Sequence, residues 1–279
     1  MKKTFQIIGL ISLTCFSFFI TEKTATVVNH MDEIMVEIKE KMNDYKSDAI
    51  DATIEDNTII PGISGKKVNI LKSYRNMKSN GYFNDKLFIY DYTKPKVSIE
   101  TNKDKYIIKG NPNKRMVSFI FTLSGDDNIT DILNILNNYK IKATFFVDYV
   151  WYKNNNSLIK EMTNLDHIIS PLMEDYTDSD FEWMDMVIKK VNKQGINFCY
   201  SKNDNQNNLD FCALKGNYTI RPTIISDKCP LVDIKDKLHP GSLFLLTDNS
   251  ELKKELSSII IYIKSKGYSI TNLDTHIIE

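Results

Sequence analysis

Apolar and polar residues alternate in blocks between residues 115 and 150, and this pattern predicts the centre of the fold. The apolar run Met116–Leu123 is followed by a turn-forming segment rich in Gly, Asp and Asn, Ser124–Asn128. After a helical stretch comes a second apolar run, Ala143–Val147. The stretch has apolar residues at helical spacing, namely Ile129, Leu133, Leu136 and Tyr139. This order predicts a strand, a helix and a parallel strand buried on both faces. The loop after the first strand is where such folds place their chemistry.

Further apolar runs of strand length follow along the chain: His167–Ser170, Ile196–Tyr200, Tyr218–Arg221, Ser242–Leu246 and Tyr268–Leu273. Helical patterns lie between several of them, most clearly at Ile129–Tyr139, Phe181–Gln194 and Leu252–Lys266. Seven expected strands alternating with helices predict an α/β domain with a parallel sheet. Their number favours a deformed seven-stranded (β/α) barrel over residues 114–279.

Residues 49–113 have a different pattern, which predicts a small accessory α/β region in front of the barrel. Residues 58–70 hold two turns between β-prone residues, and Ile70–Lys78 has the spacing of a short helix. Residues 94–100 and 104–110 alternate between apolar and polar side chains around a short polar link. We therefore expect them to form a hairpin.

The first 26 residues predict a membrane anchor or a signal sequence. Lys2 and Lys3 precede an uncharged apolar run, Phe5–Ile20. An uncleaved anchor would leave a single-pass protein at the cell membrane with its globular part extracytoplasmic. Cleavage would leave a secreted protein. Both alternatives predict export.

Residues 27–48 predict an amphipathic or coiled-coil helix beside the membrane. Its apolar residues alternate at spacings of three and four, namely Val28, Met31, Met35, Ile38, Met42 and Tyr45. A homodimer formed through residues 28–45 is one interpretation. The other is a single helix that packs on the domain or lies on lipid.

Composition limits the functions that the chain can have. Lys plus Arg and Asp plus Glu balance at 36 each, so we expect no nucleic-acid partner. Export would place Cys199, Cys212 and Cys229 in an oxidising space, where Cys199 and Cys212 enclose a loop that a disulfide could close. Buried or free thiols are the alternative.

Three segments resemble the polysaccharide deacetylases, the family-4 carbohydrate esterases with a NodB-homology domain. Residues 114–147, ending in KATFFV, look like that family's opening strand, helix and second strand. NLDHIIS, residues 164–170, resembles its third strand. Residues 239–274, from HPGSLFLLTD to a KGY turn, look like its closing section. The resemblance covers residues 114–276 and implies the deformed seven-stranded barrel.

The family's reaction, as the resemblance implies it, needs a divalent metal held by one Asp and two His, with a second Asp as base. The base position falls on Thr122 and the metal-binding Asp position on Leu123. The two metal-binding His positions fall on Leu172 and Tyr176. Leu cannot ligate a metal ion, and the Thr hydroxyl has no pKa near neutrality. We therefore predict no metal, no cofactor and no residue with the family's catalytic role.

The remaining motifs also depart from the family pattern. The family's Arg-containing motif falls on residues 199–203, which hold no Arg, and the acid His position falls on Thr247. The adjacent Asp248 does match. A relocated cation site would have to use other acidic residues near strand ends, namely Asp126, Asp127, Glu174, Asp175 and Asp248. The alternative is that Asp126 and Asp127 cap the helix that begins near Ile129 and that the others are solvated.

The sequence thus predicts a membrane-anchored, deacetylase-like pseudoenzyme whose barrel mouth could bind cell-wall glycan. The expected ligand-binding residues at the mouth are Thr122, Ser124, Asp175, Tyr176, Tyr200, Thr247 and Asp248. Other aromatic residues that could stack on a sugar, unless they pack in the core, are Tyr149, Trp151, Tyr152 and Trp183. The competing hypotheses are a carbohydrate N-deacetylase with a relocated site and an assembly protein that acts through its amino-terminal helices.

Overall fold

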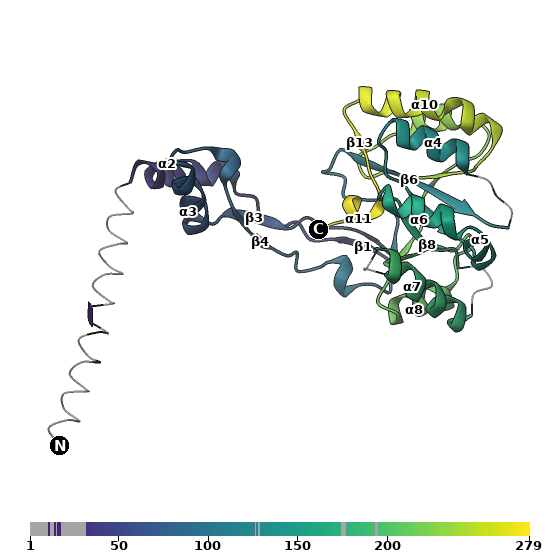
Figure 1. The fold of residues 1–279 in the computed structure, drawn as a ribbon, viewed down its shortest axis with the longest axis horizontal. Helices are drawn as coiled ribbons and strands as arrows, with labels where there is room; N and C mark the ends of the chain where they lie inside the picture. The colour runs from purple at the N-terminus through teal and green to yellow at the C-terminus, as the bar shows by residue number, and fades with distance from the viewer. Residues whose placement is uncertain are drawn as a thin grey trace, which may run out of the picture. The chain divides into compact units, whose positions relative to one another are not determined.

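The computed structural model describes residues 32–125, 127, 129–173, 177–192 and 195–279, together with residues 11, 14, 16 and 17 (Figure 1). The expected anchor, residues 1–26, lies outside this part apart from those four helical residues, so it stays a prediction. Within the described part of the chain, no helix has both the length and the apolar composition of a membrane span.

The chain divides into two compact units. The smaller holds Met1–Ala49 and Ser64–Thr93, and the larger holds Ile50–Ile63 and Lys94–Glu279. This division differs from the expected segments 27–48, 49–113 and 114–279. The reason is that strands from residues 50–63 and 94–113 hydrogen-bond to the sheet of the larger unit.

The smaller unit packs helices against a two-stranded antiparallel sheet. In chain order its elements are α2 (Glu33–Lys41), the 3-10 helix η1 (Met42–Tyr45), β3 (Gly65–Val68), α3 (Ile70–Asn80), the 3-10 helix η2 (Asp85–Leu87) and β4 (Tyr90–Thr93). The expected short helix is therefore present as α3. The Asn69 side chain caps its first turn, and Gly81 ends it with a positive φ of 81°.

Two residues of the amino-terminal apolar seam are buried inside the smaller unit. Met35 and Ile38 on α2 pack with Tyr74 and Met77 of α3 and with Phe88. The described part of this helix therefore packs on the domain, as the second interpretation expects. Residues 28 and 31 of the seam lie outside the described residues, and the homodimer stays a prediction.

The described residues of the larger unit form these strands, in chain order: β1 (Thr53–Glu55), β2 (Thr58–Ile60), β5 (Tyr106–Ile107), β6 (Met116–Leu123), β7 (Thr144–Val147), β8 (Ile168–Pro171), β9 (Phe198–Cys199), β10 (Tyr218–Ile220), β11 (Ile224–Ser226), β12 (Leu243–Leu246) and β13 (Ser269–Ile270). One sheet has the order β11-β12-β6-β7-β8, with β13 beside the start of β6. The other has the order β1-β2-β5-β10-β9. All pairs in this unit are parallel except β1 with β2.

The expected closed seven-stranded barrel is only partly present. A single bridge between Leu172 and Tyr200 links the two sheets at β8 and β9. Among the described residues, however, β10 does not pair with β11, because β5 occupies the free edge of β10. The expected strand at Tyr268–Leu273 is β13, which pairs only with the start of β6. The short strand β11, next to β12, was not expected.

Helices cover one face of the β6 sheet. They are α4 (Thr130–Asn138), α5 (Tyr149–Asn154), α6 (Asn156–Asn164), α7 (Asp178–Asn192), α8 (Gln206–Leu214), α9 (Pro230–Lys237) and α10 (Ser250–Ser265). The short helix α11 (Leu273–His276) instead places Leu273 in a second core. Figure 1 shows α4 and α10 side by side. Phe119, Phe121 and Leu123 of β6 pack in the core with these helices. Ile120, on the other face of β6, packs in a second core with Phe146 and Leu245.

The segment before β6 does not form the expected hairpin. Residues 99–101 form a 3-10 helix, η3 (Ile99–Thr101), and β5 pairs in parallel with β2 and β10. The alternating polarity over residues 104–110 therefore belongs to β5, a strand that lies between β2 and β10. The alternation did predict a strand, but it does not identify the partners of that strand.

Cys199 at the end of β9 and Cys212 on α8 form a disulfide, whereas Cys229 is free and exposed. Both bonded cysteines are fully buried. The bond closes a loop with a sequence separation of 13 residues. It ties α8 to the strand that ends beside the expected mouth.

Two histidines are buried near the starts of strands. The Nδ1 of His167 accepts a hydrogen bond from the Ala143 backbone N–H at 3.1 Å. The Nδ1 of His276 lies 2.8 Å from the Ser118 hydroxyl. Burial lowers the pKa of each to about 4. Both rings are therefore neutral in the folded protein at pH 7, and His167 has a structural role at the start of β8.

Replacing both Cys199 and Cys212 by Ala should lower the free energy of unfolding by about 2–4 kcal/mol, because the unfolded chain loses a closed loop. Urea unfolding followed by circular dichroism measures the change. The matched control is Cys229→Ala, which should leave the urea midpoint unchanged. An unchanged midpoint in the double variant would contradict the prediction.

The buried histidines should make the protein less stable in mild acid. Their folded-state pKa of about 4 lies below the ordinary value of 6.5, so the unfolded chain binds more protons between these values. The free energy of unfolding should therefore fall by up to about 3 kcal/mol per residue as pH decreases from about 6.5 to about 4. Below about pH 4 these histidines should cause little further change. Urea midpoints across this pH range measure the effect. His276→Asn should flatten the profile, and His239→Asn, at an exposed position, should not.

Candidate functional site

The carboxyl ends of the parallel strands form one edge, and the sequence positions matched to the family's motifs gather there. Register places Thr122 beside Phe146, and Leu123 beside Val147 of β7. On the other side, Leu246 of β12 is paired with Phe121. Thr247, the next residue, therefore follows the strand end level with Thr122. We refer to this end of the sheet as the carboxyl edge.

The same edge continues through β8 to β9. The Leu172 backbone N–H donates to the Val147 carbonyl at 2.9 Å, and Leu172 forms the bridge to Tyr200. The backbone N–H of Met173 donates to the Tyr200 carbonyl at 2.6 Å. Leu123, Leu172, Tyr200 and Thr247 thus lie along one edge. Asp175 and Tyr176 lie outside the described residues, so their place in the site stays a prediction.

Apolar side chains occupy two of the positions that would hold a metal. Leu123 is fully buried with Phe121 in the core beneath the helices, and Leu172 is buried in the second core with Tyr200. The Tyr200 ring packs on Phe146 with 5.3 Å between ring centroids. Across the described part of the chain, no group of three or more His, Cys, Asp or Glu residues could hold a metal ion. Leu and Thr offer no metal ligand of the kind the family's chemistry uses.

The loop after β6 is held by its own acidic residues. The Asp127 carboxylate accepts a hydrogen bond from the Ser124 backbone N–H at 2.8 Å. The Gly125 backbone N–H donates to the Asp148 carboxylate at 3.1 Å, and the Trp151 indole donates to the Asp127 carbonyl at 2.8 Å. One acidic group of this loop, Asp127, and one that follows β7, Asp148, therefore stabilise its backbone. Asp148 is a contributor that sequence reasoning missed, although its position just after β7 is that of a helix cap.

The expectation that Asp127 caps the following helix was wrong. Helix α4 begins at Thr130 with Ile129 at the cap position, and among the described residues Asp127 makes no hydrogen bond to its first turn. Asp127 instead closes the turn over residues 124–127. A carboxylate three residues after a backbone N–H closes such a turn as readily as it caps a helix, and periodicity does not distinguish the two. Asp126 lies outside the described residues.

Asp248 is half-buried just beyond β12 and is neutralised by a neighbour. Its carboxylate lies 3.3 Å from the Lys253 ammonium group on α10. Burial raises the pKa of Asp248, while the Lys253 charge opposes the rise. The negative charges of Asp127 and Asp131 raise that pKa further. Asp248 therefore matches the family at this position but is engaged in an ion pair.

Most of the aromatic residues considered for stacking pack inside the protein. Trp151 and Tyr152 are fully buried. Tyr149 and Trp183 are half-buried and meet edge to face at 5.3 Å. Of the expected mouth residues, Thr122 and Ser124 are half-buried and Thr247 is exposed. Among the expected mouth residues that the structure describes, the accessible polar groups are therefore the hydroxyls of Thr122, Ser124 and Thr247 and the half-buried Asp248.

Comparisons with known proteins agree with this fold. A family model for polysaccharide deacetylase matches residues 109–171. The chain is 30% identical over 268 residues to the uncharacterized protein YlxY of Bacillus subtilis. This alignment covers 88% of this chain and 84% of YlxY. The chain therefore belongs to the polysaccharide deacetylase family. Its departures at the metal and base positions set it apart from the pattern of the family's enzymes.

Solved structures with the same fold include a pseudoenzyme. Wild-type BA3943 of Bacillus anthracis, a CE4 family pseudoenzyme, is 23% identical with a TM-score of 0.67, covering 89% of this chain and 99% of that one. A BA3943 mutant with restored enzymatic activity has a TM-score of 0.68 at the same identity and coverage. PdaA of Bacillus subtilis, a family 4 carbohydrate esterase, is 19% identical with a TM-score of 0.54, covering 64% of this chain and 86% of PdaA. At these identities the likeness shows the shared fold.

Restoring the family's carboxylate at position 123 alone should destabilise the protein. Leu123→Asp places a charge in a fully buried apolar site, at a cost of about 3–5 kcal/mol in the free energy of unfolding. Leu123→Met keeps the volume and should cost less than about 1.5 kcal/mol. Urea unfolding at pH 7, with and without added Zn²⁺ or Mg²⁺, measures both. If either metal restores the free energy of unfolding of the Asp variant, other groups at the carboxyl edge complete a metal site.

Proposed function

We propose that this protein is a membrane-anchored, extracytoplasmic member of the deacetylase family that lacks deacetylase activity and binds cell-wall glycan at its carboxyl edge. The observation that carries this proposal is the pair of buried leucines, Leu123 and Leu172, at the family's metal-ligand positions. These residues lie on the edge where the active site of the family's fold is expected, so the chemistry is missing where the scaffold is retained.

Amide hydrolysis at this edge would lack both the metal ion and the general base on which the family's catalysis depends. A metal polarises the amide carbonyl and acidifies a water, and a carboxylate base removes the proton from that water. Here Leu123 and Leu172 replace two ligands, and Thr122 replaces the base. A neutral hydroxyl cannot take up that proton near neutral pH. The likeness to a pseudoenzyme of the same fold is consistent with this interpretation.

Glycan binding is supported by the polar groups left at the carboxyl edge. Thr122, Ser124 and Thr247 provide hydroxyl groups, and Asp248 provides a carboxylate. Hydroxyl and carboxylate groups suit a polyhydroxylated ligand, because they exchange hydrogen bonds with its hydroxyl groups. Asp175 and Tyr176 are expected to extend this surface.

An extracytoplasmic location is supported by two features. The Cys199–Cys212 disulfide is of a kind that persists in oxidising compartments and is rare in the cytosol. The apolar run Phe5–Ile20, preceded by two lysines, has the composition of an export signal or anchor.

The test uses the full chain purified in detergent and three measurements: bound metal, acetate release from N-acetylglucosamine oligomers, and co-sedimentation with peptidoglycan. We expect no stoichiometric metal, no acetate release and clear co-sedimentation. Thr247→Arg should weaken co-sedimentation about tenfold or more, equivalent to about 1.4 kcal/mol. Thr275→Arg is the matched control, because Thr275 is an exposed threonine near the opposite ends of the strands.

Each contrary result points to a different function. Metal-dependent acetate release would overturn the inactive interpretation and favour a deacetylase with a relocated site. Absence of co-sedimentation would overturn the glycan role. If that result is accompanied by dimers that dissociate on substitution of Val28 and Met31, the expected seam residues that precede the described helix, an assembly role through the amino-terminal segment gains support.

A further inference from the structure

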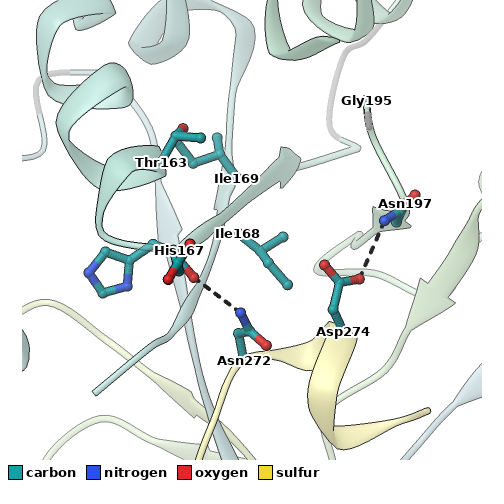
Figure 2. Close-up of a pocket in the computed structure, with 9 residues that line it drawn as sticks. Thr163, His167, Ile168, Ile169, Gly195, Asn197, Asn272 and Asp274 are labelled. Carbon is teal, nitrogen blue, oxygen red and sulfur yellow. Dashed lines mark hydrogen bonds between the residues drawn. The ribbon is translucent and has the colours of Figure 1, made fainter. Parts of the chain in front are cut away.

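A cavity of about 200 Å³ lies near the amino ends of β8 and β9, at the opposite end of these strands from Leu172 and Tyr200. Figure 2 shows the end of α6 and the start of β8 on one side of it and Asn197 with Asp274 on the other. Asn197 precedes β9, and Asp274 lies on α11. The cavity therefore joins three parts of the chain that are far apart in sequence.

Three of the side-chain donors around this cavity each make a hydrogen bond within the protein. The Asn197 amide donates to the Asp274 carboxylate at 3.3 Å, and the Asn272 amide donates to the Asp166 carbonyl at 3.1 Å (Figure 2). The Thr163 hydroxyl donates to the Ile159 carbonyl at 2.8 Å. The protein therefore offers a ligand in this cavity few unpaired side-chain donors.

Acceptors, in contrast, remain available. Only one oxygen of the Asp274 carboxylate receives a hydrogen bond from the residues that the structure describes, so its other oxygen is open to a ligand. Because the Asn197 amide nitrogen faces the carboxylate, the Asn197 amide oxygen is a second acceptor. The cavity is therefore built to receive hydrogen bonds, which favours a ligand rich in donors.

The charge of the cavity favours a cation. Asp274 is exposed as a residue, but its carboxylate lies where neighbouring atoms desolvate it, and this desolvation raises its pKa. The Asp166 carboxylate is paired with the Lys142 ammonium group at 2.7 Å. The His167 imidazole is neutral at pH 7, and its ring points away from Asp274 in Figure 2. Among the lining residues that the structure describes, none carries a positive charge that balances Asp274, so a cation bound there would offset its desolvation.

We propose that this cavity binds a primary ammonium group carried on a hydroxylated molecule of one sugar ring, such as a protonated hexosamine. Asp274 holds the ammonium group, and the Asn197 amide oxygen accepts from it or from a neighbouring hydroxyl. The volume is smaller than the ~300–1,000 Å³ of pockets for drug-sized ligands, which limits the occupant to about one ring. The proposal does not depend on the carboxyl edge, because none of its residues lies there.

The experiment is a titration of the isotope-labelled full chain in detergent at pH 7, followed by amide chemical shifts. The probes are glucosamine, N-acetylglucosamine and n-butylammonium. We expect glucosamine to shift the amide signals of Asn197 and Asp274, with N-acetylglucosamine, which lacks the charge, and n-butylammonium, which lacks the ring hydroxyls, each binding at least about tenfold more weakly. Asp274→Asn should reduce glucosamine affinity about tenfold or more. Asp236→Asn, at an exposed aspartate on α9, should not.

Equal binding of N-acetylglucosamine would overturn the role of the ammonium group, and equal binding of n-butylammonium would overturn that of the ring. Unchanged affinity in Asp274→Asn, or no shifts at Asn197 and Asp274, would overturn the site itself. Circular dichroism checks that this variant is folded. Its co-sedimentation with peptidoglycan should match the unmodified chain, so failure of the cavity proposal and failure of glycan binding at the carboxyl edge give different results.

Discussion

Strand β6 hydrogen-bonds to β12 along one edge and to β7 and β13 along the other, and both of its faces are buried. A strand in this position must have every backbone group paired and apolar side chains on both faces. The other parts of the larger unit follow from it, since α4 and α10 pack on one face and the second core on the other. Its last two residues, Thr122 and Leu123, are consequently fixed in place before any question of chemistry arises.

Fixed positions explain how the scaffold can persist when the residues at the metal-ligand positions differ from the family pattern. A metal ligand at position 123 would have to be charged, and a charge in that buried site is costly without the metal. Leu123 and Leu172 instead add apolar contacts to two different cores. Apolar residues at these positions therefore strengthen the same fold that charged ligands would weaken in the absence of a metal. Fold and activity are thus separable in this family, and function has to be argued from the residues at the site.

The two ends of the strands offer different surfaces. At the carboxyl edge, Asp127 and Asp148 are used by the loop backbone and Asp248 by Lys253, so the accessible groups are mainly hydroxyls. At the amino ends, Asp274 keeps an acceptor without a matching cation. This difference arises from the path of the chain after β13. It turns at Asn272 beside the start of β7, where the Leu273 backbone N–H reaches the Thr144 hydroxyl at 3.2 Å, and this turn brings Asp274 to the cavity.

The sequence by itself determined strand β6, whose bounds agree with the apolar run Met116–Leu123, and the replacement of the metal ligands, because both depend only on residue type and local period. Tertiary structure decided the rest. The three-residue strand β11 is too short to show a period, and the partners of β5 and β13 depend on which strand edges remain free when the chain packs. The cavity at Asp274 could not be predicted at all. It joins residues that are far apart in sequence, and no local pattern records which distant side chains will share a space.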